Sequence, residues 1–343
     1  MRYHMRLYPV LALLILGMCG CGSDGTGTQG SQSQGGQNIV NISEEESDSS
    51  VPTTSYASGE KSGKEDFTPY QAPEFADSGF HEELAQGKGD VLVDLSAVSQ
   101  GYLAVSARAD SRLKVQVIKQ NAEKTTYSYN LAQDGTPSVF PIQSGDGSYT
   151  VIVAQHTADT RYSVLYNADF EVKLEDEFQP FLCPSDYVNY NEDSECVRKA
   201  AEIAEEAEDA LGVVAGVYSY ICANVTYDRD LARSIQEKKV TVYLPDVDAV
   251  LSSGKGICFD YAALTAAMLR SQGIPTKMIF GDVSPDNLYH AWNMFYTEET
   301  GWVTVGYEVS ADSWNRLDLT FSANGADGSF IGDGSNYTDV FIY

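Results

Sequence analysis

The sequence predicts two folded regions, an antiparallel β-sandwich followed by an α+β domain, and three observations lead to this prediction. Short β-prone segments separated by turn residues fill residues 89 to about 175. Helical apolar periodicity begins after Phe181, and strand-like runs return from Thr276 onward. Short strands at regular spacing are typical of a sandwich, whereas helices followed by an antiparallel sheet are typical of an α+β domain. We therefore expect folded domains over 67–178 and 179–343.

The N-terminus has the features of an export signal. Two arginines precede the apolar run Val10–Leu16, which is too short to span a bilayer, and small residues follow it. A cysteine preceded by glycine and followed by Gly, Ser and Asp resembles the lipobox of bacterial lipoproteins, so Cys21 is the predicted lipidation site. Cys19 is the alternative, and a plain signal peptide is another interpretation. The sequence thus predicts a signal peptide over 1–20 and a lipid anchor on the extracellular face of a bacterial cytoplasmic membrane.

The composition of the next segment predicts a tether, and the overall charge excludes one class of partner. Residues 21–66 are rich in Gly, Ser, Gln, Thr and Glu and nearly lack aromatic residues. Such a segment cannot bury enough apolar surface to offset its ordering entropy, which predicts a disordered tether. The chain carries 22 basic and 49 acidic residues, a net charge of −27. So acidic a surface repels nucleic acid, and no nucleic-acid partner is expected.

The predicted sandwich consists of short segments, several of which alternate apolar with polar residues as half-buried strands do. Glycine-containing turns separate them, including Asp134-Gly135 and Gly145-Asp146-Gly147. The region contains no cysteine and no cluster of metal ligands, so a spacer or binding module is the favoured interpretation. The predicted strands are Val91–Leu95, Tyr102–Ser106, Leu113–Val117, Thr125–Tyr129, Tyr149–Ala154 and Tyr162–Tyr166.

Three helices and four strands are expected in the second region. Asp193 or Ser194 can cap a first helix that runs to about Ala207, and a second helix covers about Ala210–Asn224. A third begins at Cys258, with Gly273 as its C-terminal cap. The strand-like runs are Thr276–Phe280, Tyr289–Tyr296, Gly301–Val309 and Arg316–Phe321.

Cys258 is the candidate nucleophile because of where it stands. It follows the turn Gly254-Lys255-Gly256 and begins the third helix. The unpaired first-turn amides of a helix carry partial positive charge, and they favour the reactive thiolate. His290 and Asp318 follow, each in an apolar strand-like segment, so nucleophile, base and orienting carboxylate occur in that order. Asp260 is interpreted as an acid stabilised by the helix dipole.

This constellation supports acyl-transfer chemistry. The Cys258 thiolate would attack an amide carbonyl, His290 would protonate the departing amine, and water or an amine would resolve the thioester. If their strands are neighbours, Asp318 can fix the tautomer of the imidazole. The Cys258 amide would donate to the oxyanion, and Tyr227 is a second donor suggested only by analogy.

The same residues carry a family resemblance. The stretch Gly254–Ala262, the ending Arg270–Pro275 and the segment Tyr289–Asn293 resemble the transglutaminase-like superfamily over about 180–343. The resemblance implies a papain-like fold and a catalytic triad of Cys258, His290 and Asp318. Two departures affect Asp318, which Leu319 follows where proline is frequent and which lies far from His290 in the chain. Glu308 and Asp312 are alternative orienting residues.

Several functional questions stay open at this stage. The leading hypothesis is cysteine-dependent transfer or hydrolysis of glutamine or peptide amides in a protein or cell-wall peptide, and the alternative is a non-catalytic surface binding protein on the same scaffold. No cofactor is expected, and the Gly-rich turns near 324–334 lack the oxygen ligands of a metal site. Spacing allows a bridge between Cys183 and Cys196, and Cys222 is interpreted as a small buried apolar residue.

Overall fold

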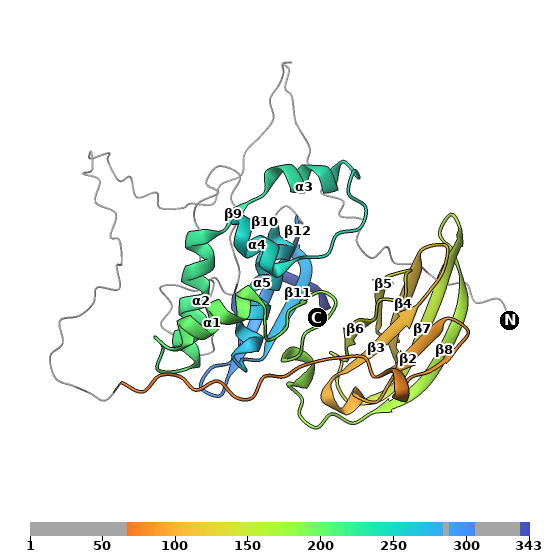
Figure 1. Cartoon of the computed structure of the whole chain (residues 1–343), viewed down its shortest axis with the longest axis horizontal. Helices are drawn as coiled ribbons and strands as arrows, with labels where there is room; N and C mark the ends of the chain where they lie inside the picture. Colours follow the sequence, from red (N-terminus) through yellow and green to blue (C-terminus); the bar gives the residue numbers. More distant parts are fainter. Residues whose placement is uncertain (1–66, 284–287, 306–336) are drawn as a thin grey trace, which may run out of the picture. The chain divides into compact units, whose positions relative to one another are not determined.

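The computed structural model of the chain describes residues 67–283, 288–305 and 337–343 (Figure 1). Strands dominate up to Val172, helices follow, and an antiparallel sheet comes last. This order is the predicted one, and the α+β fold class with a preceding sandwich is confirmed. Among the described residues, no helix has the length and apolar character needed to cross a bilayer.

Two four-stranded antiparallel sheets form the sandwich, with strand orders β1-β2-β3-β6 and β5-β4-β7-β8 (Figure 1). Apolar side chains from both sheets join one buried cluster, among them Val93, Leu103, Val115 and Val151. The strands are β1 (Gln86–Lys88), β2 (Val91–Asp94), β3 (Tyr102–Ala107), β4 (Leu113–Lys119), β5 (Thr126–Leu131), β6 (Ser138–Pro141), β7 (Gly147–Ala158) and β8 (Arg161–Val172). Short 3-10 turns are η1 (Glu82–Leu84), η2 (Val98–Gln100) and η3 (Gln179–Phe181).

The predicted strands correspond to six of these eight. In β4, Leu113, Val115 and Val117 are buried while the intervening side chains are half-buried, which is the period of two that made the strand predictable. The sequence did not indicate β1 and β6. All three residues of β1 are exposed, and β6 is only four residues long and ends in a proline, so neither has a usable apolar alternation.

Among the described residues, five α-helices precede the sheet of the second region. They are α1 (Glu195–Ala204), α2 (Ala210–Asn224), α3 (Arg229–Gln236), α4 (Val247–Ser253) and α5 (Cys258–Ser271). Every residue of α5 from Phe259 to Ser271 is buried. This helix packs against α1, α2 and α4 and against the strands β11 and β12. Its alanines keep the helix narrow, so it can be enclosed on all sides.

Two short helices, α3 and α4, were not predicted. In α3 only Ile235 is buried, so there is no apolar stripe to recognise, although Asp228 caps its start. Helix α4 has seven residues and is capped by Asp246. Helix α1 starts after Ser194 as predicted, but its first amides, those of Glu195 and Cys196, donate to the Asp248 carboxylate of α4 at 3.2 and 3.0 Å. A cap supplied by a distant helix cannot be read from local sequence.

The last sheet is antiparallel with the order β13-β12-β11-β14. Its strands are β11 (Thr276–Val283), β12 (Leu288–Thr297), β13 (Gly301–Val305) and β14 (Tyr337–Ile342). Three of the predicted strand segments correspond to β11, β12 and β13, and residues 306–309 of the third predicted segment lie outside the described residues. The predicted strand Arg316–Phe321 lies outside the described residues, and β14, which the sequence did not indicate, pairs with β11.

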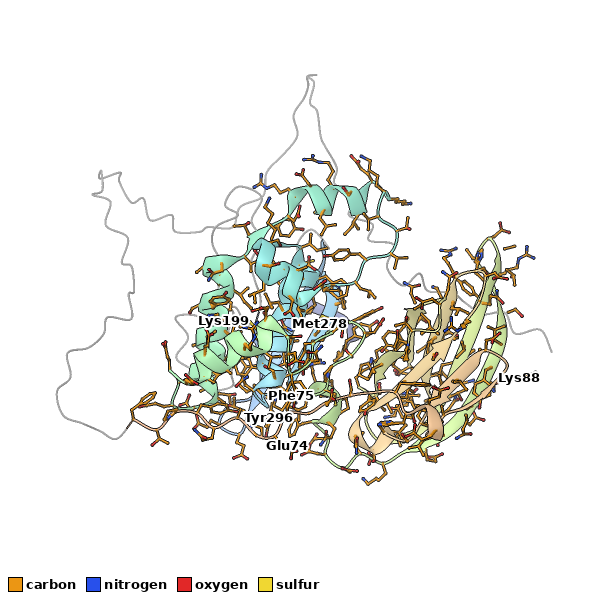
Figure 2. The ribbon with its side chains drawn as sticks, viewed as in Figure 1. Glu74, Phe75, Lys88, Lys199, Met278 and Tyr296 are labelled. Atoms are coloured by element: carbon orange, nitrogen blue, oxygen red, sulfur yellow. The ribbon has the colours of Figure 1, made fainter. Side chains whose placement is uncertain are left out.

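The segment before the sandwich is anchored on the second region. Tyr70 donates its N–H to Ala207 at 2.7 Å and its hydroxyl to the Gln272 carbonyl at 2.9 Å. Figure 2 labels Phe75, whose ring meets that of Tyr190 edge-on at 5.7 Å. Gly273, with φ of +72°, leaves no space for a side chain, because a Cβ there would lie 2.0 Å from the Pro73 ring. Residues Thr68–Tyr343 accordingly fall in one compact unit.

A buried arginine holds the end of α5. The Arg270 side chain is only 1% exposed. Its guanidinium donates to the carbonyls of Thr276, Cys183 and Tyr343 at 2.9, 3.0 and 3.2 Å. These carbonyls belong to three separate segments, so the single side chain joins the helix to the sheet and to the chain that leaves the sandwich. Burial lowers the pKa of this group from its ordinary value.

Candidate active site

The nucleophile turn is built by a two-stranded parallel ribbon. The strand β10 (Lys255–Gly256) pairs with β9 (Thr226–Tyr227). Helix α4 ends in Gly254 with φ of +61°, a left-handed conformation that favours glycine. The chain then passes directly from β10 into α5, which places Cys258 at the first position of the helix. The predicted helix start and its glycine turn are therefore present in the structure.

The helix start is capped from within. Asp260 accepts a hydrogen bond from the Ile257 N–H at 2.8 Å, and the Tyr243 hydroxyl donates to its other oxygen at 2.7 Å. The Asp260 side chain is fully buried. The sequence predicted only a favourable interaction of this acid with the helix dipole. The structure adds a direct capping bond and a partner from the loop between α3 and α4.

The Cys258 thiol is half-buried, and its surroundings act on its pKa in both directions. Burial raises its pKa to about 11, and the Asp260 charge acts in the same direction. Backbone hydrogen bonds from Ala291 and Phe259 act to lower this pKa. A hydrogen bond lowers a thiol pKa when it is donated to the sulfur, so the backbone amides of Ala291 and Phe259 are donors to Cys258. The resting thiol is thus neutral, with amide donors already in place.

The structure brings β12 to the nucleophile. His290 is in this strand, opposite Gly281 of β11, and it is 9% exposed. Its chain neighbour Ala291 supplies the backbone amide at the Cys258 sulfur. The segments that carry two of the predicted catalytic residues are therefore adjacent in space, although they are 32 positions apart in the sequence.

Several other predicted site residues lie outside the described part of the chain, whereas Tyr227 lies within it. Asp318 lies outside the described residues, as do the alternatives Glu308 and Asp312 and the predicted lipidation site Cys21 with its alternative Cys19. Tyr227, in β9 beside Gly256, has a pKa raised by burial and, secondarily, by the charges of Cys258 and Asp260. Its phenol is consequently close enough to interact electrostatically with the nucleophile.

Asn293 is a buried site residue to which the sequence had given no role. Its amide nitrogen donates to the carbonyl of Ala262 in α5 at 3.0 Å and to that of Lys277 in β11 at 3.3 Å. Its oxygen has no hydrogen-bond partner among the described atoms. Asn293 thereby fixes β12 against the nucleophile helix, three positions after His290. Because it lies inside the apolar strand pattern, only its polarity could have marked it.

The remaining cysteines do not form the bridge that their spacing allowed. Cys183 and Cys196 are both free thiols. Cys183 packs with Ala97 and Tyr102 in a small separate cluster, whereas Cys196 is in α1 within the main core. Cys222 is half-buried rather than fully buried, and burial raises its pKa to about 11.

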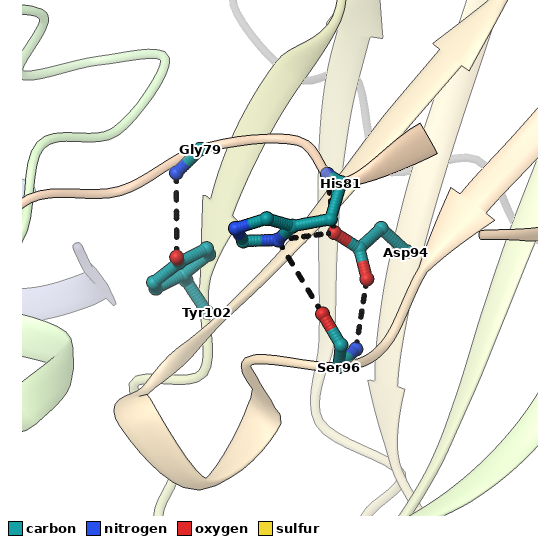
Figure 3. A network of polar contacts seen from close by, with 5 residues as sticks. All are labelled: Gly79, His81, Asp94, Ser96 and Tyr102. Carbon is teal, nitrogen blue, oxygen red and sulfur yellow. Dashed lines mark hydrogen bonds and ion pairs between the residues drawn. The ribbon is translucent and has the colours of Figure 1, made fainter. Parts of the chain in front are cut away.

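A polar network in the sandwich also contains a histidine and an acid (Figure 3). The buried Asp94 carboxylate lies 3.0 Å from His81 Nδ1 and accepts the backbone N–H of His81 and Ser96 at 2.8 and 2.9 Å. The Ser96 hydroxyl lies 3.4 Å from the same Nδ1. A catalytic triad needs acid and hydroxyl on different imidazole nitrogens, so this network has a structural geometry. The described residues contain no group of three metal-ligating side chains.

Comparison with known proteins identifies the helical and sheet region. Residues 197–306 match the model of the Transglutaminase-like superfamily. This segment is a transglutaminase-like domain. The match includes Cys258 and His290, and the fold class predicted from the sequence is the one observed.

Three of the solved structures that are similar to this chain are described as proteases or as a transglutaminase. A candidate cysteine protease from Cytophaga hutchinsonii shares 17% identity over 69% of this chain and 80% of its own, with a TM-score of 0.34. Red sea bream transglutaminase shares 13% identity over 62% and 49%, with a TM-score of 0.25. A candidate protease from Parabacteroides distasonis shares 11% identity over 64% and 63%, with a TM-score of 0.28. A search of the curated proteins finds no match.

Proposed function

We propose that this chain is a cysteine-dependent enzyme that transfers or hydrolyses acyl groups of glutamine or peptide amides. One observation carries the proposal: the Cys258 sulfur, at the first position of α5, receives the backbone amide of Ala291, the neighbour of His290. Nucleophile and base thus come from adjacent elements of a transglutaminase-like domain.

In this mechanism the Cys258 thiol transfers its proton to His290, and the resulting thiolate attacks the amide carbonyl. His290 then protonates the departing amine, which leaves a thioester on the sulfur. The amides at the start of α5 stabilise the oxyanion, and Tyr227 is the proposed second donor. Asp318 orients the imidazole as the third member of the triad. Water or a second amine resolves the thioester and frees the enzyme.

The proposed setting is the outer face of a bacterial cytoplasmic membrane, where Cys21 would carry the lipid and residues 21–66 would act as a tether. A substrate in a surface protein or in cell-wall peptide fits that setting. The net charge of −27 supports the absence of nucleic acid among the partners. Radiolabelled palmitate incorporated in cells into the wild-type chain but not into Cys21→Ala tests the anchor. Equal labelling of both chains would reject it.

The nature of the acceptor can be tested directly. Purified protein would be incubated with a glutamine-containing peptide, with and without hydroxylamine, and both ammonia and hydroxamate would be measured. Ammonia that appears equally in both samples indicates a hydrolase, whereas hydroxamate formation indicates a transferase. Both products should disappear in Cys258→Ala and persist in Cys222→Ala, which removes another half-buried thiol.

A second candidate function is non-catalytic binding on the same scaffold. It is favoured by the resting thiol, whose pKa of about 11 is no lower than that of Cys222. Under this alternative, Cys258 would react with iodoacetamide no faster than Cys222 does. Reaction at Cys258 that depends on His290 would exclude it.

A further inference from the structure

The loop between α3 and α4, residues 237–246, reaches the nucleophile helix through one tyrosine. The Tyr243 hydroxyl donates to an oxygen of Asp260 at 2.7 Å. The Tyr243 ring also meets that of Phe259 at 6.4 Å between centroids, with the planes 71° apart. Phe259 and Asp260 are the two residues that follow Cys258. Through Tyr243 the loop therefore contacts the first turn of the helix.

The surroundings of Asp260 are shaped to fit its carboxylate. One oxygen receives the Ile257 N–H and the other receives the Tyr243 hydroxyl, so both oxygens are hydrogen-bonded. A Cβ on Gly256 would lie 2.6 Å from the Asp260 Cβ and 3.2 Å from its Oδ2. Glycine at position 256 is thus required by the acid four residues later. The residues on both sides of Cys258 are consequently fixed by this one side chain.

A charged cap at this position is electrostatically unfavourable for the proposed chemistry. Among the described residues, no basic side chain forms an ion pair with Asp260. Its pKa is raised by burial and further by the neighbouring Asp228 carboxylate, while its own charge acts against ionisation of Cys258. At this third helical position an uncharged amide side chain could also accept the Ile257 N–H. Capping alone therefore does not explain the acid.

We propose that Asp260, held by Tyr243, is the positioning residue of this site: it sets the first turn of α5 around Cys258 and ties that turn to the loop 237–246. The assignment rests on the proposed function, because it supposes that Cys258 is the reacting group. In the resting site the same carboxylate also disfavours the thiolate. Full ionisation of Cys258 is then left to proton transfer to the histidine of β12.

The test is the pH dependence of alkylation at Cys258, which requires no knowledge of the substrate. Titratable groups that interact with the thiol or its cap are Asp260 of α5, Tyr227 of β9, Asp228 and Tyr243 of the loop, and the neighbouring strand β12 carries His290 next to Ala291. Iodoacetamide would be reacted with the full chain from pH 6 to 11, and labelling of Cys258 followed by peptide mapping. The variants are Asp260→Asn and Tyr243→Phe. The matched control is Tyr261→Phe, which removes a hydroxyl of α5 that donates to the Val225 carbonyl at 2.8 Å.

Asp260→Asn removes the charge and keeps the shape, so the apparent pKa of Cys258 should fall by about 1, with labelling at pH 7 roughly three- to tenfold faster. Tyr243→Phe should speed hydrogen exchange of the amides of residues 256–260 at least about threefold. This second effect should vanish when Asp260→Asn is already present, and Tyr261→Phe should show neither effect.

An Asp260→Asn profile within about 0.3 of the wild-type pKa would overturn the proposal, as would exchange in Tyr243→Phe that matches the Tyr261→Phe control. If Asp260→Asn does not fold, the exchange experiment on Tyr243→Phe decides alone. Failure of the proposed function gives a different result, because turnover would then be absent in the wild-type chain while the alkylation shift remained.

Discussion

The sandwich and the transglutaminase-like region bury polar side chains to very different extents. Among the described residues, the sandwich buries only Asp94 and Ser128, whereas eleven buried polar or charged residues lie beyond residue 178. A buried polar group destabilises a fold unless its hydrogen bonds are made. Most of the eleven are in α5, in β11 and β12 or in the link between them. Polar burial among the described residues is therefore concentrated in the nucleophile helix and the strands beside it, with Asp260, His290 and Asn293 near the candidate site and Arg270 at the other end of the helix.

The two buried aspartates make the difference concrete. Asp94 in the sandwich is covered by backbone amides and by His81, which is itself 44% exposed, and it ties a loop to a strand. Asp260 is enclosed at a helix start, two residues after a cysteine, and accepts hydrogen bonds from a backbone amide and a phenol. The first arrangement favours the charged acid, whereas the second disfavours it. Only the second is expected to influence reactivity.

The largest expected effect is on catalysis. Cys258→Ala and His290→Ala should each lower turnover of a glutamine-containing peptide by about a thousandfold or more, because each removes a group that acts in bond formation or proton transfer. Circular dichroism melting would verify that both variants fold. The matched sandwich variant His81→Ala should retain wild-type turnover. Equal loss in all three would remove the functional distinction between the two regions.

The next effect is on stability. Arg270→Ala removes the guanidinium donor from the buried carbonyls of Thr276, Cys183 and Tyr343, of which Tyr343 keeps the Met278 N–H, and should cost about 3 kcal/mol or more of unfolding free energy. Urea denaturation would measure it. Arg161→Ala, at a position whose side chain is 74% exposed, is the control and should be nearly neutral. A small effect at Arg270 would show that buried polar bonds do not hold the second region together.

A smaller effect is expected in the sandwich. Burial acts to raise the pKa of Asp94, but hydrogen bonds from Ser96 and His81 outweigh it, and the pKa is lowered. Its stabilisation is present above the unfolded-state pKa of about 3.9 and is lost as pH falls through the folded value. Asp94→Ala should thus cost about 1–2 kcal/mol at pH 7 and less in acid. Alkylation of Cys258 should stay at the wild-type rate, and a change there would contradict the separation of roles.

The smallest expected effect is an increase in stability, caused by the substitution Asp186→Asn. Burial raises the pKa of Asp186 to about 6, against a hydrogen bond from Ser138 that acts to lower it. The folded state therefore favours the neutral acid, and this contribution is present below pH about 4 and is lost as pH rises through about 6. Asp186→Asn should stabilise the chain by about 1 kcal/mol at pH 7. Melting curves at pH 4 and 7 would measure it, and a stabilisation that persists at pH 4 would disagree.

Sequence alone predicted the parts of the fold with strong local signals. The Cys258 helix was recognisable because a glycine turn precedes it, an apolar run fills it and a glycine follows it, and β4 was recognisable by its alternation. Helix α3 escaped because it buries one residue. The roles of Asn293, Tyr243 and Arg270 escaped for another reason. Their partners are between 6 and 87 positions away in the chain, so only the folded structure shows them.

The packing of the extended segment before the sandwich also could not be predicted from local sequence. The composition predicted a folded region that starts near residue 67, and the segment that follows packs on the second region before the sandwich begins. Tyr70 bonds Ala207 and Gln272, and the Ser78 hydroxyl donates to the Pro184 carbonyl at 3.0 Å. Apolar periodicity carries no information about such extended segments, because their backbone bonds go to loops rather than to a ladder.

The central claim is that Cys258 is activated by its neighbours in β12, and alkylation rates test it most directly. Iodoacetamide labelling of Cys258 and Cys222 would be followed in the same sample at pH 7 by peptide mapping, in the wild-type chain and in His290→Ala. We expect Cys258 to react at least about tenfold faster than Cys222 in the wild type and to slow to the Cys222 rate without the imidazole. Equal rates for the two thiols in the wild-type chain, or a Cys258 rate unchanged in His290→Ala, would contradict the account.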